Sequence, residues 1–435
     1  MSDGSRLGIY GMGKLGLPLA ASFAATGVRT FGIDVNAALV ADLCQGKIAS
    51  QEPGLAELIG KAGSDLTFHV SPQGLELPAS LVQVPTPSSP DDPGFSARFV
   101  RDAVASACAE VAQRPARPER HLVIIASTVM PGTIAAEVRP MLTAAERRSG
   151  CRFSLAYVPD LVAIGNVVAG FHRPPCLMIG ADDPATVREV EALYGRIVVP
   201  DVPRARLTIA EAEIAKVAWN FYLCFKISFA NTLARLAGQV SDVNVDRLTE
   251  TLALDARIGK GFLKGGMPFG GPCFPRDVDA MEALLTGHGL DGSLAGVVRQ
   301  SNLGHHDHIA ALVLAERPRS VGIAGLAFKS GTDVTVESPS FVLIQRLLAA
   351  GVAVHAYDPS QRARLALKEE PWAGPVVCWD SLEDLAANAD LIVAGVNDPR
   401  LLGLSALAGT GTPVLDPWGF LPAGPASLRR PGRDG

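Results

Sequence analysis

The chain has 435 residues, of which 48% are hydrophobic and 19% are charged, and its 39 basic and 44 acidic side chains leave a net charge of −5. This length exceeds what one hydrophobic core organises and predicts two or three domains. No block of basic residues indicates binding to nucleic acid or to a membrane surface, and no apolar run reaches the roughly 18 uncharged residues of a membrane span.

The cysteines indicate a reducing compartment. They number seven, stand at positions 44, 108, 151, 176, 224, 273 and 378, and include no Cys-x-x-Cys pair. Scattered cysteines in an odd number fit reduced thiols better than a disulfide framework or a zinc site. No charged-then-apolar leader precedes the first predicted strand, so we expect a cytoplasmic protein rather than a secreted one.

A glycine-rich turn follows the first predicted strand, at residues 7–10. Gly11, Gly13 and Gly16 form the pattern G-x-G-x-x-G, and a helical pattern runs from 17 to 26. The first glycine permits the tight turn, the second lets the backbone approach a pyrophosphate, and the third allows close packing of helix on strand. The phosphates would lie at the helix N-terminus. The alternative is a glycine-rich turn that binds nothing.

A carboxylate follows the second predicted strand, at the place where a dinucleotide-binding turn needs one. The second predicted strand, 29–33, ends at Asp34, about 20 positions further along the chain. At that position a carboxylate can accept hydrogen bonds from an adenosine ribose. Residues 35–38 include no arginine to bind a 2′-phosphate. The pattern therefore predicts NAD rather than NADP.

Further strands alternate with helices, which predicts a mostly parallel sheet. The strand 81–84 is followed by Thr86, and the strand 122–126 is followed by Thr128. Ligands of such sheets bind beyond the carboxyl ends of the strands, so both threonines are candidate contacts for cofactor or substrate. Each hydroxyl is equally suited to a turn or a helix cap.

A long helix is predicted over residues 206–238. The segment has almost no glycine or proline and carries apolar residues at helical spacing. At 1.5 Å per residue it would extend roughly 50 Å, which is longer than one domain needs. We expect it to bridge domains and to dimerise. Lys216 and Asn220 are four positions apart on it, so they share a face and can point at one substrate.

Cys273 is the candidate nucleophile. It follows Gly270, Gly271 and a proline, and we expect it to begin a helix on which Asp277 lies one turn later. Backbone N–H groups and the dipole at a helix N-terminus lower a thiol pKa and favour the thiolate. An ordinary buried cysteine is the alternative. The two glycines favour the nucleophile, because packing alone rarely needs such backbone freedom.

The remainder of the chain predicts a second α/β unit. It opens with the segment 320–329, and further strands are predicted at 353–357, 391–396 and 413–416. This half lacks the G-x-G-x-x-G pattern, so we expect it to bind a different nucleotide group. Residues 423–435 are predicted to form a disordered tail.

Three histidines lie close together between these regions. His305, His306 and His308 match no common spacing of metal ligands. We predict that they form a solvated helix face, and we expect no metal site.

These motifs, in this order, resemble the nucleotide-sugar dehydrogenase family, which includes UDP-glucose, GDP-mannose and UDP-N-acetylmannosamine dehydrogenases. The similarity extends from Gly11 to about Gly419. The matching segments are Gly11-Met12-Gly13-Lys14-Leu15-Gly16, Val84-Pro85-Thr86-Pro87, Ser127-Thr128-Val129, Glu213-x-x-Lys216-x-x-x-Asn220, Gly270-Gly271-Pro272-Cys273-Phe274-Pro275-Arg276-Asp277, Gly325-Leu326-Ala327-Phe328-Lys329 and Thr332-Asp333-Val334-x-x-Glu337-Ser338-Pro339.

The resemblance implies an α/β fold of two Rossmann-like doubly wound domains joined by a long central helix. The expected division is an NAD-binding domain at 1–204, a central helical region for dimerisation and catalysis at 205–310, and a nucleotide-sugar-binding domain at 311–422. The tail 423–435 follows. The expected partners are a nucleotide-sugar substrate and a second copy of the chain.

The resemblance also implies oxidation of a primary alcohol to a carboxylate with two NAD+ consumed. Asp277, with a water positioned by Thr128, would accept the proton of the C6 hydroxyl. Cys273 would trap the aldehyde as a thiohemiacetal, and the thioester formed next would be hydrolysed by water. Lys216 and Asn220 would stabilise the developing oxyanion.

The implied contacts fall into two sets. The cofactor contacts are Gly11, Met12, Gly13, Leu15, Gly16, Asp34, Val84, Pro85, Thr86, Ser127, Thr128 and Lys329. The substrate contacts are Leu161, Lys216, Asn220, Arg257, Phe262, Leu263, Lys264, Phe269, Gly270, Phe328 and Lys329. Among these, Arg257 is expected to reach a neighbouring subunit.

Three positions depart from the family pattern. The family loop Asn-Pro-Glu-Phe-Leu-x-Glu-Gly corresponds to residues 158–165, where Asp160 replaces a glutamate with a role in thioester hydrolysis. The shorter side chain keeps the charge but withdraws it by a methylene. Ile164 replaces the second glutamate and can do no acid–base work. Trp418 stands where family members place an arginine that contacts the nucleotide.

Three hypotheses follow. The first is a UDP-sugar 6-dehydrogenase, closest to UDP-glucose 6-dehydrogenase, with a divergent substrate loop. The second is a family member that stops after one oxidation or acts on an unusual nucleotide or nucleoside substrate of a specialised pathway, which Asp160 and Trp418 motivate. The third is a silent nucleotide-sugar-binding protein, against which the retention of Cys273 and Asp277 argues.

Overall fold

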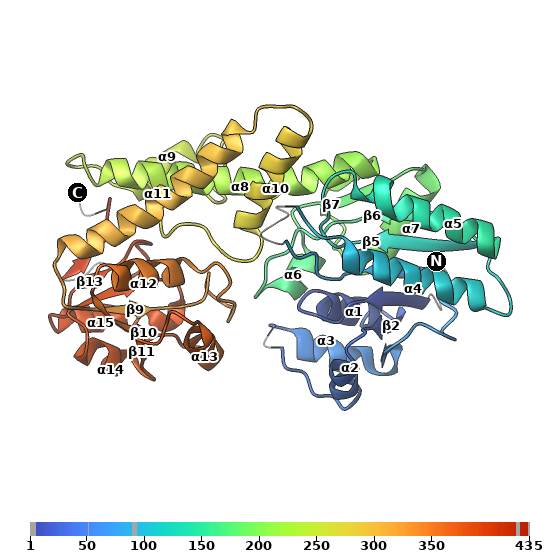
Figure 1. The fold of residues 1–435 in the computed structure, drawn as a ribbon, viewed down its shortest axis with the longest axis horizontal. Helices are drawn as coiled ribbons and strands as arrows, with labels where there is room; N and C mark the ends of the chain where they lie inside the picture. Colours follow the sequence, from blue (N-terminus) through green and yellow to red (C-terminus); the bar gives the residue numbers. More distant parts are fainter. Residues whose placement is uncertain (1–5, 51, 89–93, 423–426, 434–435) are drawn as a thin grey trace. The chain divides into compact units, whose positions relative to one another are not determined.

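A computed structural model of the chain describes residues 6–50, 52–88, 94–422 and 427–433. The chain divides into two compact units, Met1–Ala218 and Trp219–Gly435. Figure 1 shows strands flanked by helices in each of them. The predicted α/β class, with two doubly wound sheets and one long helix, is confirmed. None of the helices in the described residues is long and apolar enough to cross a membrane.

The first unit contains an eight-stranded sheet in the order β3-β2-β1-β4-β5-β6-β7-β8, in which β6 and β7 pair antiparallel and the other neighbours pair parallel. Its strands are β1 (Arg6–Tyr10), β2 (Arg29–Ile33), β3 (Leu66–His69), β4 (Ala79–Val82), β5 (Arg120–Ile125), β6 (Arg152–Tyr157), β7 (Leu177–Ala181) and β8 (Arg204–Leu207). Its helices are α1 (Gly16–Ala24), α2 (Ala37–Cys44), α3 (Leu55–Ala62), η1 (Gly63–Asp65), α4 (Arg98–Gln113), η2 (Ile134–Val138), α5 (Arg139–Ser149), α6 (Val167–His172) and α7 (Pro184–Tyr194).

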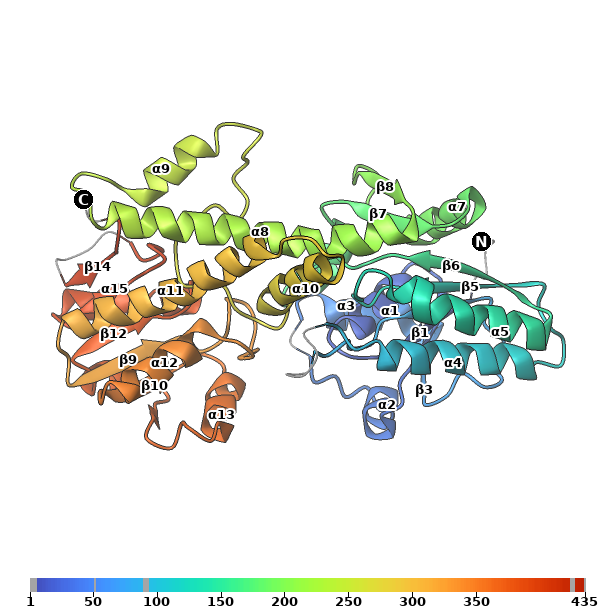
Figure 2. The same cartoon turned by 45° about the horizontal axis from the view of Figure 1, so that its top comes forward.

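Both faces of this sheet are covered, so its central strands are mostly apolar. Leu7 and Ile9 of β1 have no exposed surface and pack in one core with the apolar helix α1. Figure 2 shows α4 and α5 side by side along the sheet. A parallel sheet buried on both faces needs such continuous apolar strands. The strand order reverses between β1 and β4, and ligands of doubly wound sheets bind beyond that reversal.

The second unit contains a six-stranded parallel sheet in the order β11-β10-β9-β12-β13-β14. Its strands are β9 (Ser320–Ala324), β10 (Ala353–Tyr357), β11 (Val377–Cys378), β12 (Leu391–Ala394), β13 (Val414–Leu415) and β14 (Leu428–Arg429). Its helices are α9 (Val245–Leu252), α10 (Phe274–Gly287), α11 (Ser293–Ala315), α12 (Pro339–Ala349), α13 (Gln361–Glu369), α14 (Leu382–Ala387), η3 (Pro399–Leu401) and α15 (Leu404–Gly409).

Alternation along β12 shows how this sheet holds its helices. Leu391 and Val393 belong to the core that contains α11 and α12, whereas Ile392 and Ala394 belong to the core that contains α14 and α15. Successive side chains of a strand point to opposite faces. The helices therefore cover both faces of the sheet, as Figure 1 shows for α12 and α14.

The long helix predicted over 206–238 is α8 (Ile209–Ala237), with 29 residues. It spans the boundary between the two units, so Lys216 belongs to the first unit and Asn220 to the second. The two side chains lie one helical turn apart on α8, as the spacing predicts.

The expectation of a disordered tail over 423–435 is wrong for residues 427–433. Leu428 and Arg429 form β14, which pairs with β13, and Arg433 is only 6% exposed. An apolar residue at the sheet edge and a buried guanidinium give this polar segment fixed partners. Residues 423–426 and 434–435 of the predicted tail lie outside the described residues.

The expectation of a solvated histidine face is also wrong, because His305 is 2% exposed and His306 is 7% exposed. His305 lies on α11, and its Nε2 is 2.8 Å from the carbonyl oxygen of Gly266. A carbonyl only accepts, so this nitrogen carries the proton and donates. The residue is a buried structural histidine.

Candidate active site

The glycine turn after β1 has the geometry of a pyrophosphate cradle. Gly11 has φ +94°, and its N–H donates to the Ile33 carbonyl at 2.7 Å. A Cβ on Gly16 would lie 1.8 Å from the Gly11 carbonyl oxygen, so only glycine lets α1 approach the turn. A Cβ on Gly13 would meet nothing within 4 Å. Space is therefore open beside Gly13, at the start of α1.

Asp34 lies against this turn. Its Oδ2 accepts the Met12 N–H at 2.8 Å, and its Oδ1 accepts the Asn36 N–H at 2.9 Å. The carboxylate is half-buried, and each oxygen keeps a further lone pair for a ribose hydroxyl. The open cradle and the adjacent carboxylate fit the phosphates and adenosine ribose of NAD.

The ends of β4 and β5 are joined by a serine. Ser127 is 1% exposed, accepts the Val84 N–H at 2.8 Å and donates to the Val84 carbonyl at 2.9 Å. Its hydroxyl is thus used within the fold at the strand ends. Thr86 is buried, and Thr128 is half-buried just after β5.

A buried lysine and a buried carboxyl oxygen lie together in the first unit. Lys216 is 7% exposed, and its ammonium donates to the backbone carbonyl of Asp160 at 2.7 Å. The Oδ2 atom of Asp160 is buried and finds no hydrogen-bond partner among the described residues. Burial raises the pKa of this carboxyl to about 7, and the Lys216 charge opposes the shift. Asp160 can therefore exchange a proton near neutral pH.

Two glutamates hold the loops beside these groups. Glu213, 1% exposed, accepts the N–H groups of Gly132 and Ile134 at 2.9 and 3.0 Å and so caps η2. Glu52 accepts the Val167 N–H at 2.5 Å, at the start of α6, and the Gly165 N–H at 3.2 Å. The loop that carries Asp160 is thereby anchored even though Ile164 offers no carboxylate.

In the second unit, the predicted catalytic residues come together at the start of α10. Cys273 is exposed and immediately precedes the helix, as predicted. The Asp277 N–H donates to the Cys273 carbonyl at 2.8 Å, so the two lie one turn apart. Asp277 has no exposed surface, and its carboxylate accepts from Asn220 Nδ2 at 2.5 Å and from Arg276 Nε at 3.3 Å. An accessible thiol thus stands beside a buried, oriented carboxylate.

A second cysteine of this unit gives a contrast. Cys224 lies on α8, has no exposed surface, and its Sγ is 3.7 Å from the Phe274 carbonyl. Burial raises the pKa of the Cys224 thiol, and the nearby Asp277 charge adds to the shift. The thiol of Cys224 stays protonated, so Cys273 is the better nucleophile of the two.

The segment before Cys273 is clamped by the loop 328–338. A Cβ on Gly270 would lie 2.0 Å from the Glu337 carbonyl oxygen, which accepts the Gly271 N–H at 3.2 Å. A Cβ on Gly271 would lie 2.4 Å from the Phe328 ring. The consecutive glycines therefore serve close approach, and Glu337 adopts φ +51° to present its carbonyl.

Buried polar side chains hold the rest of this irregular segment. Asn231 accepts the Gly266 N–H at 2.9 Å, and Asn302 both accepts the Phe269 N–H at 2.9 Å and donates to its carbonyl at 3.0 Å. His305 donates to the Gly266 carbonyl. These side chains replace the backbone pairing that a helix or strand would supply. The path of the chain toward Cys273 is therefore fixed.

The predicted substrate residues of this unit are grouped around that segment. The Phe274 ring centroid lies 6.1 Å from that of Phe262 and 6.4 Å from that of Phe269. Lys264 is exposed, and Lys329 Nζ lies 5.7 Å from the Phe328 ring centroid. The side chain of Arg257 is 89% exposed and pairs with Asp255 instead of joining this group. Leu161 lies in the other unit, on the Asp160 loop.

The second sheet has a glycine turn and a carboxylate at the places where the first sheet has Gly11 and Asp34, but here the carboxylate is buried. Gly325 has φ +97°, and its N–H donates to the Tyr357 carbonyl at 2.7 Å. Asp358 accepts the Leu326 N–H at 2.7 Å but is only 2% exposed. Trp418, half-buried, donates from Nε1 to the Gly395 carbonyl at 3.3 Å, just beyond β12. This carboxylate is used within the fold, and an indole lies at the strand-order reversal.

Sequence reasoning missed the residues that hold the site in place. These are Glu52, Asn231, Asn302, His305, Glu337 and Arg433. Only two of them could have been found from the sequence. Glu337 lies in one of the family motifs, and His305 lies in the histidine cluster that we predicted to be exposed.

Comparison with known proteins agrees with this geometry. The models of the UDP-glucose/GDP-mannose dehydrogenase family match the chain as an NAD binding domain at 5–198, a central domain at 210–303 and a UDP binding domain at 322–421. UDP-glucose 6-dehydrogenase AglM of Haloferax volcanii is 32% identical over 395 residues, covering 88% of this chain and 89% of the relative. GDP-mannose 6-dehydrogenase of Azotobacter vinelandii is 28% identical, covering 96% and 97%.

A solved structure extends the likeness to the fold. The UDP-glucose dehydrogenase of the archaeon Pyrobaculum islandicum superposes with a TM-score of 0.87 at 30% identity, covering 99% of this chain and 98% of that one. The chain therefore belongs to the UDP-glucose/GDP-mannose dehydrogenase family and is an NAD-dependent nucleotide-sugar dehydrogenase.

Proposed function

We propose that this dehydrogenase oxidises the C6 primary alcohol of a UDP-sugar, UDP-glucose or a close relative, to the carboxylate. The observation that carries the proposal is the start of α10, where the exposed thiol of Cys273 lies one turn before the buried carboxylate of Asp277. Oxidation of an alcohol to an acid through an enzyme-bound acyl group needs such a thiol and such a base. The likeness to UDP-glucose 6-dehydrogenase AglM, at 32% identity, supports uridine as the base.

The first oxidation uses Asp277 as the base. It accepts the proton of the C6 hydroxyl through a water that Thr128 holds, and C6 becomes an aldehyde. The turn at Gly13 and the carboxylate of Asp34 would hold NAD+, which would supply the hydride acceptor for both oxidations. Lys216 and Asn220 donate to the oxygen on C6, where negative charge develops.

The second oxidation and the hydrolysis use Cys273 and Asp160. The thiolate adds to the aldehyde carbon to form a thiohemiacetal, which is oxidised to a thioester. Water then attacks the acyl carbon, the C–S bond breaks, and the carboxylate and the thiol are released. Asp160 removes the proton of that water, and its pKa of about 7 suits this role near neutral pH.

The test is the number of NADH molecules formed per substrate consumed, with UDP-glucose, GDP-mannose and UDP-N-acetylhexosamines in separate reactions. We expect two NADH per UDP-glucose. One NADH, or a burst equal to the enzyme concentration, would mean that the reaction stops at the aldehyde or the thioester. No NADH from any of these sugars would contradict the proposal.

A second candidate is a dehydrogenase of the same family with an unusual nucleotide or nucleoside substrate. Trp418 favours it, because an indole at the reversal of the second sheet can stack on a planar base but cannot contact phosphate as an arginine does. Turnover of a GDP-sugar or a nucleoside in preference to UDP-glucose would support this candidate.

The assembly we propose is a homodimer through α8. Tyr222, Phe225, Phe229 and Leu236 are 55%, 40%, 44% and 56% exposed, and their spacing of three, four and seven places them along one face of the helix. A contiguous exposed apolar stripe of this kind marks an interface. Phe229→Asp should give a monomer in light scattering, whereas the matched control Leu365→Asp, on α13, should stay dimeric. A wild-type monomer would contradict this assembly.

The domain division and the compartment are part of the same proposal. The three matched family domains, at 5–198, 210–303 and 322–421, fall inside the boundaries 1–204, 205–310 and 311–422. All seven cysteines are free of disulfides, which supports a reducing cytoplasm.

A further inference from the structure

The segment 427–433 folds back onto the helical part of the second unit. Its β14 extends the sheet, and the Gly432 carbonyl accepts the Val245 N–H at 2.8 Å. Asn244 Nδ2 donates to the Arg433 carbonyl at 2.9 Å. These bonds bring the Arg433 side chain to the start of α9.

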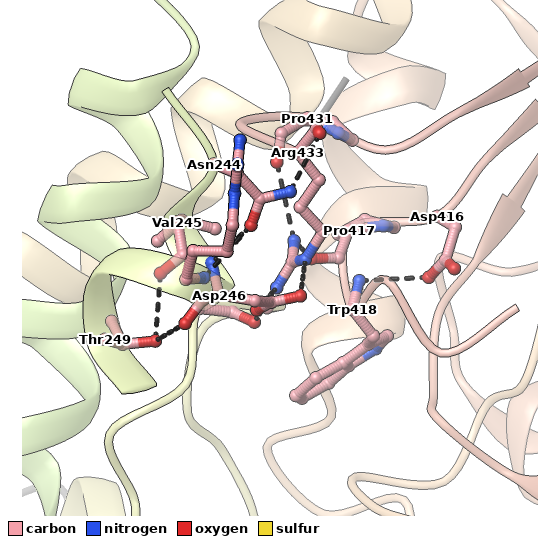
Figure 3. A network of polar contacts seen from close by, with 12 residues as sticks. Asn244, Val245, Asp246, Thr249, Asp416, Pro417, Trp418, Pro431 and Arg433 are labelled. Carbon is pink, nitrogen blue, oxygen red and sulfur yellow. Dashed lines mark hydrogen bonds and ion pairs between the residues drawn. The ribbon is translucent and has the colours of Figure 1, made fainter. Parts of the chain in front are cut away.

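The Arg433 guanidinium links three parts of the chain (Figure 3). Nε and Nη2 donate to the two carboxylate oxygens of Asp246 at 2.7 and 3.0 Å. Nη1 donates to the Pro417 carbonyl and Nη2 to the Gly265 carbonyl, each at 2.8 Å. The guanidinium is planar and carries donors in a fixed fork, so it sets the spacing of its partners. At 6% exposure it does so away from solvent.

The Gly265 and Pro417 carbonyls each lie next in sequence to a residue that we place at the nucleotide end of the substrate. Gly265 directly follows Lys264, which we assign to the substrate, and Pro417 directly precedes Trp418. The two loops also touch, because a Cβ on Gly266 would lie 2.2 Å from the Trp418 ring. Arg433 therefore acts on the backbone beside both side chains.

The turn after Trp418 is shaped around this guanidinium. Gly419 has φ +59°, and a Cβ there would lie 2.3 Å from Arg433 Nε. Any larger residue would displace the guanidinium from Asp246. The glycine is thus an independent sign that the loop 416–419 is built to receive Arg433.

Apolar packing covers only part of this segment. Leu428 is buried, and a Cβ on Gly432 would lie 2.7 Å from the Ala234 carbonyl oxygen of α8, but residues 428–433 also line a cavity of about 690 Å³ together with the end of α8 and with α11. The polar bonds of Arg433, together with the exposed ion pair of Arg429 and Glu316, supply much of the remaining attachment.

We propose that Arg433 is a positioning residue for the nucleotide end of the substrate, because it holds the Lys264 loop and the Trp418 loop at a fixed separation. The inference rests on the proposed function and adds a residue that touches no substrate itself. Without the guanidinium, the Gly265 and Pro417 carbonyls lose their donor and Asp246 loses its partner, so the two loops separate.

The test compares Arg433→Met and Arg433→Lys with the wild-type protein. Calorimetric titration with UDP in the absence of NAD, KM values for UDP-glucose and NAD, and kcat are measured for each. Arg433→Met should weaken UDP binding and raise the UDP-glucose KM by about tenfold or more, while the NAD KM changes by less than about twofold.

The second variant keeps the test open if Arg433→Met does not fold. Arg433→Lys retains the charge beside Asp246 but cannot donate to both carbonyls as well, so it should fold and still bind UDP more weakly than wild type. Arg429→Met, which removes the exposed ion pair of the same segment, is the matched control and should bind UDP normally.

The outcomes separate the two claims. Wild-type affinity for UDP in both Arg433 variants, or an equal loss of UDP and NAD affinity, would overturn the positioning role. A wild-type protein that bound no UDP and oxidised no UDP-sugar would overturn the proposed function, and the substrate end assigned to Arg433 with it.

Discussion

The two thiols near the start of α10 differ in ways that decide which one can react. Cys273 is exposed, whereas Cys224 is buried and burial raises the pKa of its thiol. We expect Cys273→Ala to lower carboxylate formation by at least about a thousandfold, because no thioester can form. NAD affinity, measured by fluorescence titration, should be unchanged.

The matched variant Cys224→Ala removes a thiol from the same unit and should keep more than about half of the turnover, at a modest cost in stability. Normal turnover by Cys273→Ala would exclude the thioester route.

Asp160 gives the second prediction at this scale. Burial raises the pKa of its carboxyl to about 7, so the group is largely protonated at pH 6 and largely ionised at pH 8. A base works only when ionised, so the rate of thioester hydrolysis should rise with pH through about 7. The measurement is kcat between pH 5.5 and 9, which should show this limb in the wild type.

Asp160→Asn should remove the limb and leave a low, flat rate with a burst of NADH. A variant that hydrolyses as fast as wild type would show that another group activates the water.

At the scale of elements, the glycines before α10 are predicted to control the position of the nucleophile. An alanine methyl at Gly270 would lie 2.0 Å from the backbone oxygen of Glu337, so one of the two segments must move. We expect Gly270→Ala to lose about 1–3 kcal/mol of unfolding free energy and at least about tenfold in kcat.

The control is Gly287→Ala, at the other end of α10, where an added Cβ meets nothing within 4 Å. Its stability should be equal or slightly higher. Urea denaturation and steady-state rates measure both variants, and equal behaviour of the two would refute the clamp.

What the sequence predicts and what it misses also divides by element. The Gly11 turn, Asp34, α8 and the start of α10 follow from patterns contained in short segments, and all were predicted. The partners of the loop before Cys273 were not, because they come from remote parts of the chain. Arg433 and Asp246 are 187 positions apart, and no local period relates them. His305 shows the same limit. Its burial depends on the Gly266 carbonyl, 39 positions away in the sequence, and the helical pattern alone does not reveal that contact.

At the scale of the whole molecule, buried histidines predict how stability depends on pH. Burial lowers the pKa of His305 to about 4 and that of His306 to about 3 in the second unit, and lowers that of His121 to about 3 in the first. In an unfolded chain histidine titrates near 6.5. Between about pH 6.5 and 4 the unfolded chain therefore binds more protons than the folded one, and the free energy of unfolding falls as pH falls.

Each histidine adds up to about 1.4 kcal/mol per pH unit to the slope of the free energy of unfolding in that window, and it adds nothing to the slope above the window. His305→Gln keeps a donor for Gly266 but does not titrate, so its free energy of unfolding should fall less steeply than that of wild type. Urea denaturation at pH 7, 6 and 5 measures the slope. An unchanged slope in His305→Gln would refute the assignment.

The distribution of the cysteines over the molecule bears on how the enzyme is handled in the laboratory. Cys44 and Cys273 are exposed, whereas Cys108, Cys151 and Cys224 are buried. Alkylating reagents should modify the two open thiols first, and only the label on Cys273 should abolish turnover. The unlabelled fraction of Cys273, measured by mass spectrometry, then gives the fraction of active sites that are intact. Samples stored without a reductant should lose activity, through oxidation of Cys273, long before they unfold.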